Sequence, residues 1–284
     1  MITSKISLTA LDVAHHYDEL DDFYRLAWGD HVHHGLWDNE NDTRSVEDAT
    51  LHLLQRVTST LHLKSGDHLA DIGCGYGASS RWLAQTHGLN ITALTISEKQ
   101  TAQARLEPPP SSGHIDYRVE DWLQNSLPDN SLHAAIAIES LAHMEDKALF
   151  FQQIHRTLKP GAHAALAVWT TADDLTRLES HLLQKVCEEG RLPGMGTLQE
   201  YQQLAASTGL LVTEAVDITP QVERTWWIIT RRVLTGLFTN PHYLRFILNR
   251  AFRKRIFVLT LPRLLLAYRT GAMRYAIITL QKPH

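Results

Sequence analysis

Three histidines lie between two tryptophans in the stretch WGDHVHHGLW, which runs from Trp28 to Trp37. Imidazole nitrogens can ligate a transition metal, but no cysteine stands nearby and the spacing is not that of an H-E-x-x-H helix. The stretch could instead be a hydrogen-bonded piece of core or a wall of an active site. We expect no metal site here, and the rest of the chain has to decide between the other two interpretations.

A glycine cluster, DIGCGYG, spans Asp71 to Gly77 at the end of a short apolar run. Glycines let the backbone turn sharply and approach a ligand closely, and the N–H groups that open the next helix can bind a polar group. Gly73, Gly75 and Ala78 satisfy the G-x-G-x-x-G/A spacing of a dinucleotide loop. Such a site also needs an acidic residue at the end of the next strand, and that strand ends in LTIS. A dinucleotide is therefore disfavoured, while a glycine turn without a ligand stays open.

Two titratable residues, Glu139 and His143, lie at the end of a later strand pattern. The pattern is HAAIAIES, and its last residues are Glu139 and Ser140. His143 comes four residues after Glu139. In open α/β sheets, ligands bind at the carboxyl ends of the strands. Glu139 and His143 are therefore candidate catalytic residues, with His143 as the general base, because an imidazole is useful near neutral pH. The alternative is that His143 only packs against a ligand.

The elements that must position these residues alternate between strand and helix from residue 68 onward. This alternation predicts parallel βαβ units in a Rossmann-like, doubly wound α/β sheet that is mostly parallel. Seven strands are expected, at HLADI, LNITALTI, IDYRVEDW, HAAIAIES, AHAALAVW, LLVTEAVDI and RYAIITLQK. Residues 10–60 instead look helical, because apolar positions such as Val46, Ala49 and Leu53 recur at three- and four-residue spacing.

Four segments are expected along the chain: a helical cap, a core, a helical lid inserted into the core, and the last core strand. They cover residues 1–60, 61–219, 220–273 and 274–284. The inserted segment is unusual in charge, since Arg224–Arg274 holds eleven Lys/Arg residues and no acidic one, whereas the rest holds 16 basic and 31 acidic residues. It could be an amphipathic surface that contacts an anionic membrane. Alternatively it is a lid whose apolar face roofs a pocket and whose arginines are solvated or paired with the acidic body.

Composition bounds the class of protein. The 284 residues are 44% hydrophobic and 20% charged, as in an ordinary soluble globular chain. The two cysteines, Cys74 and Cys187, are far apart, so a disulfide framework is not expected. The first twenty residues lack an apolar run of signal-peptide length, and the apolar stretch 256–268 is interrupted by Pro262 and Arg263. We expect a cytoplasmic protein, with no nucleic-acid partner because the net charge is −4 and no nucleic-acid-binding fold is evident.

The order of the motifs DIGCGYG, ITALTISEKQ, RVEDWL, AIAIESLAHM and LKPGA resembles that of the class I S-adenosylmethionine-dependent methyltransferases. The stretches HYDELDDFYRLAWGDHVHHGLWD, ESLAHMEDK and IITLQKP further resemble the tocopherol C-methyltransferase family, which includes indole-alkaloid N-methyltransferases and bacterial natural-product relatives. The resemblance covers nearly the whole chain. It departs at ESLAHM, where tocopherol enzymes carry a glycine, and at KPGA, where a double glycine is usual. These departures put the substrate in doubt more than the reaction.

The resemblance implies S-adenosylmethionine as the cofactor. Asp71 would lie near its amino group, Thr95 and Gln100 would hold its ribose, and Asp121 would accept the adenine amino group. Trp122, expected to stack on the adenine, could equally be core, and Gln100 could be a solvated helix residue. The residues assigned to the cofactor are Tyr17, Trp28, Asp71, Gly73, Cys74, Gly75, Thr95, Ile96, Gln100, Asp121, Trp122, Glu139 and Ser140.

The resemblance also places WGDHVHHGLW over a substrate pocket. His33, His34 and Trp37 would then form an aromatic wall with polar edges, and His143 and Trp169 would also touch the substrate. The function implied is methyl transfer to a hydrophobic, aromatic small molecule at carbon, nitrogen or oxygen, as in natural-product metabolism. The alternatives are a prenyl-diphosphate C-methyltransferase and a non-catalytic cofactor-binding partner protein.

Overall fold

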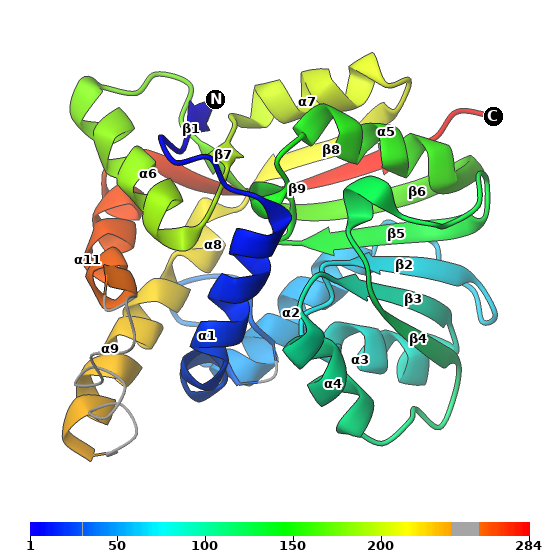
Figure 1. The fold of residues 1–284 in the computed structure, drawn as a ribbon, viewed down its shortest axis with the longest axis horizontal. Helices are drawn as coiled ribbons and strands as arrows, with labels where there is room; N and C mark the ends of the chain where they lie inside the picture. The colour runs from blue at the N-terminus through cyan, green and yellow to red at the C-terminus, as the bar shows by residue number, and fades with distance from the viewer. Residues whose placement is uncertain (30, 240–255) are drawn as a thin grey trace.

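The computed structural model describes residues 1–29, 31–239 and 256–284, and a seven-stranded sheet forms its centre (Figure 1). The strands follow the order β4-β3-β2-β5-β6-β9-β8, with β9 antiparallel to both of its neighbours and the other pairs parallel. Their bounds are β2 (His68–Ile72), β3 (Asn90–Thr95), β4 (His114–Val119), β5 (Leu132–Ile138), β6 (Leu158–Thr171), β8 (Leu211–Asp217) and β9 (Met273–Gln281). The expected seven-stranded, mostly parallel sheet is confirmed.

The sheet is buried on both faces, which explains why its central strands are apolar throughout. Alternate residues of a strand join different core clusters: Ile72 packs on one face, whereas Leu69 and Ile136 pack on the other. One face is covered by α5 (Lys147–Thr157) and α7 (Leu198–Ser207), the other by α2 (Val46–Thr58) and α3 (Ala78–His87). The remaining core helices are α4 (Glu98–Leu106), α6 (Arg177–Gly190) and the short turns η1 (Trp122–Gln124) and η2 (Leu141–His143).

The N-terminal segment is helical in only two parts. A strand β1 (Ile2–Thr3), which pairs with β7 (Gly194–Met195), precedes α1 (Ala10–Trp28), and residues 31–45 are irregular up to α2. The expectation of helix throughout 10–60 is therefore wrong for residues 31–45. Gly29, at φ 84°, follows the last residue of α1. A Cβ on Gly35 would lie 2.7 Å from the Ala49 Cβ, so this chain segment packs by its bare backbone against α2.

The basic insertion forms α8 (Thr219–Val222), α9 (Arg224–Thr239) and α11 (Ile256–Arg269). With α1 and α6, these helices gather at the carboxyl ends of the parallel strands (Figure 1). Arg263 binds Glu189 at 2.6 Å and Arg232 binds Glu47 at 3.1 Å. These pairs favour the lid interpretation. Five of the eleven basic residues fall in 240–255, outside the described residues, so membrane contact stays a prediction, as does the four-segment division.

No helix among residues 1–29, 31–239 and 256–284 is both long and apolar enough to cross a membrane.

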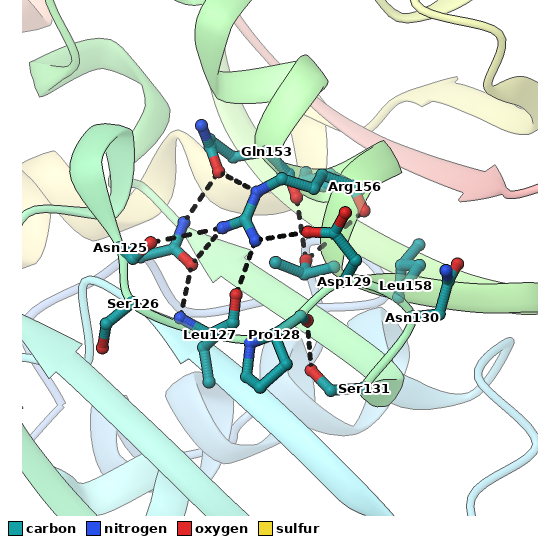
Figure 2. A network of polar contacts seen from close by, with 12 residues as sticks. Asn125, Ser126, Leu127, Pro128, Asp129, Asn130, Ser131, Gln153, Arg156 and Leu158 are labelled. Carbon is teal, nitrogen blue, oxygen red and sulfur yellow. Dashed lines mark hydrogen bonds and ion pairs between the residues drawn. The ribbon is translucent and has the colours of Figure 1, made fainter.

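A polar network holds the connection between η1 and β5 in place (Figure 2). The Arg156 guanidinium donates to the Leu127 carbonyl at 2.5 Å, to the Asp129 carboxylate at 2.9 Å and to the Asn125 side chain at 2.8 Å. Asn125 in turn donates to the Trp122 carbonyl at 2.7 Å. One arginine of α5 thus holds the segment that follows Trp122.

Candidate active site

A cavity of about 450 Å³ lies at the carboxyl ends of β2, β3 and β5. The strand ends and the turns η1 and η2 form its floor, and α1, α6, α9 and α11 contribute the remaining walls. The lining contains four carboxylates, including Glu120 and Glu145, and among the described residues it contains no lysine or arginine. Such a lining is suited to a ligand that carries positive charge.

Most of the residues predicted for the site meet in this cavity. Those that line it are Tyr17, Trp28, His34, Gly73, Gly75, Thr95, Ile96, Gln100, Asp121, Trp122, Glu139, Ser140, His143 and Trp169. Asp71, Cys74 and His33 line a second cavity of about 40 Å³. It shares Val32, Gly73, Gly75 and Ile138 with the first. The placement leaves the individual roles of these residues as predictions.

Two residues that were expected to touch the substrate do not line the large cavity. Trp37 is 2% exposed and packs on Val46 and Ala49, away from both cavities, and its indole N–H donates to the Arg44 carbonyl at 3.2 Å. Its ring fills the space beside Gly35, where a side chain is missing. His33 borders the small cavity beside the glycine loop instead of the large one, because its Nδ1–H donates to the His34 carbonyl at 2.8 Å and turns the ring that way.

The glycine loop presents bare backbone and a buried carboxylate. Gly73 has φ 80°, and a Cβ there would lie 2.4 Å from the Ser140 Cβ; Gly75 has φ 55° and open space where its Cβ would be. Asp71 accepts a 2.5 Å hydrogen bond from Ser80, and burial raises the pKa of its carboxyl to about 6. The Nε2 atom of His33 is buried without a hydrogen-bond partner among the described residues. An acidic group and an unused acceptor beside open backbone fit the amino-bearing end of S-adenosylmethionine.

The other end of the floor is built from β3 and η1. Thr95 donates to the Gln100 side chain at 2.7 Å, so the two residues expected at the ribose are joined to each other. The Asp121 carboxylate accepts from the Leu123 backbone N–H at 3.0 Å and caps η1. The Trp122 indole N–H donates to the Phe150 carbonyl at 3.3 Å, which ties the ring to the core although it also lines the cavity. Trp122 is therefore part of the core, and its stacking on the adenine stays a prediction.

Tyr17 and His143 form a hydrogen-bonded pair across the cavity. The His143 Nδ1 atom lies 3.3 Å from the Arg191 carbonyl, which can only accept, so Nδ1 carries the proton. Nε2 is then an acceptor, and the Tyr17 hydroxyl donates to it at 2.8 Å. Burial lowers the pKa of His143 to about 4 and raises that of the Tyr17 phenol, so both are neutral near pH 7.

Glu139 belongs to a different hydrogen-bond set. Its Oε1 atom accepts from the His34 backbone N–H at 2.7 Å, from His34 Nδ1 at 2.8 Å and from the Tyr275 hydroxyl at 2.8 Å. Burial alone would raise the pKa of Glu139, but the charge and hydrogen bonds of His34 hold it below its usual value. Glu139 therefore fixes His34, and the described contacts join it to His34 and not to His143.

Three aromatic residues near the site were not predicted from the sequence. Tyr268 and Tyr275 hydrogen-bond His34 and Glu139, and the Trp226 ring lies 5.4 Å from the His34 ring. Trp226 and Tyr268 come from the basic insertion, whose apolar positions were expected to roof a pocket, and this was the available signal. Tyr275 lies in the last strand, and the apolar residues that follow it indicated a core strand and not a site residue.

The chain matches the family model described as mycolic acid cyclopropane synthetase over residues 5–232. The chain belongs to this family. It is 32% identical over 234 residues to the O-methyltransferase resE of Aspergillus sclerotiorum, covering 80% of this chain and 86% of that protein. It is 28% identical over 291 residues to the chloroplastic tocopherol O-methyltransferase of Arabidopsis thaliana, covering 95% of this chain and 82% of that one.

Among solved structures, the cyclopropane synthase MmaA2 from Mycobacterium tuberculosis shares the fold, with a TM-score of 0.83 at 21% identity over 98% of this chain and 100% of that one. The resemblance to class I methyltransferases is thereby confirmed. The chain is an S-adenosylmethionine-dependent methyltransferase of this family, as expected for enzyme class and cofactor.

Proposed function

We propose that this enzyme methylates a hydroxyl oxygen of a hydrophobic, aromatic small molecule such as a phenol. The observation that carries the proposal is the Tyr17–His143 pair, a neutral acceptor joined to a phenolic hydroxyl inside the cavity. A weakly acidic O–H group needs such a partner to give up its proton. The names of two relatives, an O-methyltransferase and a tocopherol O-methyltransferase, support the same chemistry.

Bound S-adenosylmethionine supplies an electrophilic methyl group on a positively charged sulfur. The protein's main task is therefore to align the acceptor and keep water away from it. Apolar side chains of the cap and lid, among them Leu8, Val13 and Leu264, line the cavity and provide that dry space. The Trp169 indole N–H is buried without a hydrogen-bond partner among the described residues, so it can donate to the acceptor oxygen.

Proton removal follows from the direction of the hydrogen bonds. Tyr17 Oη takes the proton of the substrate hydroxyl while its own proton passes to His143 Nε2, and the electron pair of the broken O–H bond stays on the substrate oxygen. His143 becomes an imidazolium whose Nδ1–H keeps its bond to the Arg191 carbonyl. Because burial disfavours this cation, we expect the proton to move together with the methyl group and not before it.

The prenyl-diphosphate alternative receives less support. A diphosphate needs cationic partners, and the described lining of the cavity contains no lysine or arginine. The acidic lining instead suits the positive charge of the cofactor.

The test is transfer of label from methyl-labelled S-adenosylmethionine to a panel of phenols, prenylquinols, indoles and prenyl diphosphates. We expect a methyl ether from a phenol or a quinol. Label that appears only on a ring carbon, an indole nitrogen or a prenyl diphosphate would overturn the proposed acceptor. Tight cofactor binding without transfer to any of the four classes would favour the non-catalytic alternative.

A further inference from the structure

Lys147 is a buried lysine that the proposed reaction leaves unused. It is the first residue of α5 and is 5% exposed. The N-terminus of a helix carries the positive end of its dipole, which opposes a cation. Burial of an ammonium group is costly as well, and it lowers the pKa of Lys147 to about 7. A lysine in such a place needs a compensating interaction.

That interaction is with the turn that carries His143. The Lys147 ammonium donates to the Ala142 carbonyl at 2.9 Å and to the Met144 carbonyl at 2.5 Å, the carbonyls of the residues on either side of His143. Within the turn, the His143 N–H donates to the Ser140 carbonyl and the Met144 N–H donates to the Leu141 carbonyl, both at 3.1 Å. Lys147 thus supplies two further bonds to the same turn.

The charge of Lys147 also acts on its neighbours. The titratable groups that interact with it are His143 on η2 and Cys187 on α6. Its positive charge adds to burial in lowering the pKa of His143, whereas the Arg191 carbonyl and Glu139 act in the opposite direction. The carboxylate of Asp146, the N-cap residue of α5, accepts a hydrogen bond from the Leu149 backbone N–H at 2.9 Å.

We propose that Lys147 is the positioning residue for His143, because it holds the two carbonyls that flank His143 and so sets the imidazole against the Tyr17 hydroxyl. The proposal rests on the proposed role of the Tyr17–His143 pair for its effect on turnover. Its effect on the turn and on the imidazole is independent of which substrate is used.

The experiment compares Lys147→Met, Lys147→Arg and the control Lys159→Met. Lys159 also bonds a histidine, His133 at 2.7 Å, but neither residue lines the cavity. We measure the pKa of His143 by NMR, the pH profile of kcat, and the Kd for S-adenosylmethionine. Lys147→Met should lower kcat about 10- to 100-fold, as expected for a misplaced catalytic group, and leave the Kd within about threefold.

The same variant should raise the pKa of His143 and move the acidic limb of the kcat profile to higher pH. Lys147→Arg keeps a charged donor, so its His143 pKa and its acidic limb should lie closer to those of the wild type. Lys159→Met should change neither the His143 pKa nor the acidic limb. A lower kcat with an unchanged His143 pKa and an unmoved limb would mean that Lys147 only stabilises the fold, and the proposal would be overturned. A Lys147→Met variant with unchanged kcat, unchanged His143 pKa and an unmoved acidic limb would overturn it as well.

Two measurements keep the test decisive. If Lys147→Met does not fold, the wild-type enzyme is titrated by NMR, and the His143 signals should show a second inflection where Lys147 ionises. Absence of that inflection contradicts the proposal. If no substrate of the panel is methylated, the NMR result still decides on Lys147, so failure of the proposed function is distinguishable from failure of this inference.

Discussion

Glu139 combines a buried charge with an unusual backbone conformation. Its φ of 61° lies in the left-handed region, which costs energy for any residue other than glycine. Three donors from His34 and Tyr275 meet its Oε1 atom and offset that cost. The four-residue spacing in the sequence placed Glu139 and His143 at one strand end, but it could not show that they face different partners.

Replacing Glu139 by Gln tests how much this charge stabilises the fold. We expect a loss of about 1–3 kcal/mol in the free energy of unfolding at pH 7, because buried donors lose a charged acceptor. The lowered pKa of Glu139 means that its contribution is present above the unfolded value of about 4.3 and is lost as the pH falls through the folded value. Urea unfolding of both proteins should therefore differ less at pH 3.5 than at pH 7. The exposed Glu98→Gln serves as the control, and an equal difference at both pH values would contradict the prediction.

The Tyr17 hydroxyl can be removed without changing the ring. Tyr17→Phe should lower kcat by about 10²-fold or more if the hydroxyl relays the proton, with cofactor affinity within a few-fold. His143→Ala should cost a similar factor, and the double variant should be little worse than either, because the two groups act as a unit. Stopped-assay kinetics and cofactor titration separate the outcomes. Weaker cofactor binding at unchanged kcat would instead favour the cofactor-binding role that the family resemblance implies for Tyr17.

At the scale of elements, the sequence predicted the strands better than the loops. Each expected strand exists because burial on both faces demands an apolar run such as HAAIAI, and such runs are visible in any single sequence. Residues 31–37 were misassigned because their conformation depends on partners far along the chain, for example the bond from Trp37 N–H to the Gln221 carbonyl at 2.9 Å. For the same reason the sequence could not show that His33 borders the small cavity and that Trp37 lines neither cavity. The glycine loop could be predicted, since its conformation is local.

Gly73→Ala tests the contact between the glycine loop and the end of β5. The new Cβ would lie 2.4 Å from the Ser140 Cβ in a residue at φ 80°, so the loop or β5 has to shift. We expect cofactor affinity to fall about tenfold or more, on the order of 1.4 kcal/mol, measured by calorimetric titration. Gly66→Ala is the matched control: its φ of 87° imposes similar strain, but nothing lies within 4 Å of the added Cβ. Equal losses in both variants would show that strain, and not the Ser140 contact, is responsible.

At the scale of the whole molecule, the site joins parts of the chain that are far apart in sequence. Its walls come from α1, the strand ends and the insertion, and the insertion also contributes Trp226 and Leu264 to a core cluster with Trp28. This cluster is separate from the two that cover the faces of the sheet. Cap and lid therefore pack on each other around the cavity, and a ligand in the cavity would contact both.

Ligand binding should consequently stabilise cap and lid more than the far end of the sheet. A ligand that binds only the folded state adds RT ln(1 + [L]/Kd), about 2.7 kcal/mol at 100 times Kd. With S-adenosylhomocysteine at that excess, we expect a higher Tm and slower amide exchange in α1, the glycine loop and η1, because residues of these elements line the cavity. Exchange in α7, which packs on the sheet and does not line the cavity, should change little. Uniform protection of all these elements, measured by mass spectrometry, would contradict a local effect, because it would mean that the chain opens only by global unfolding.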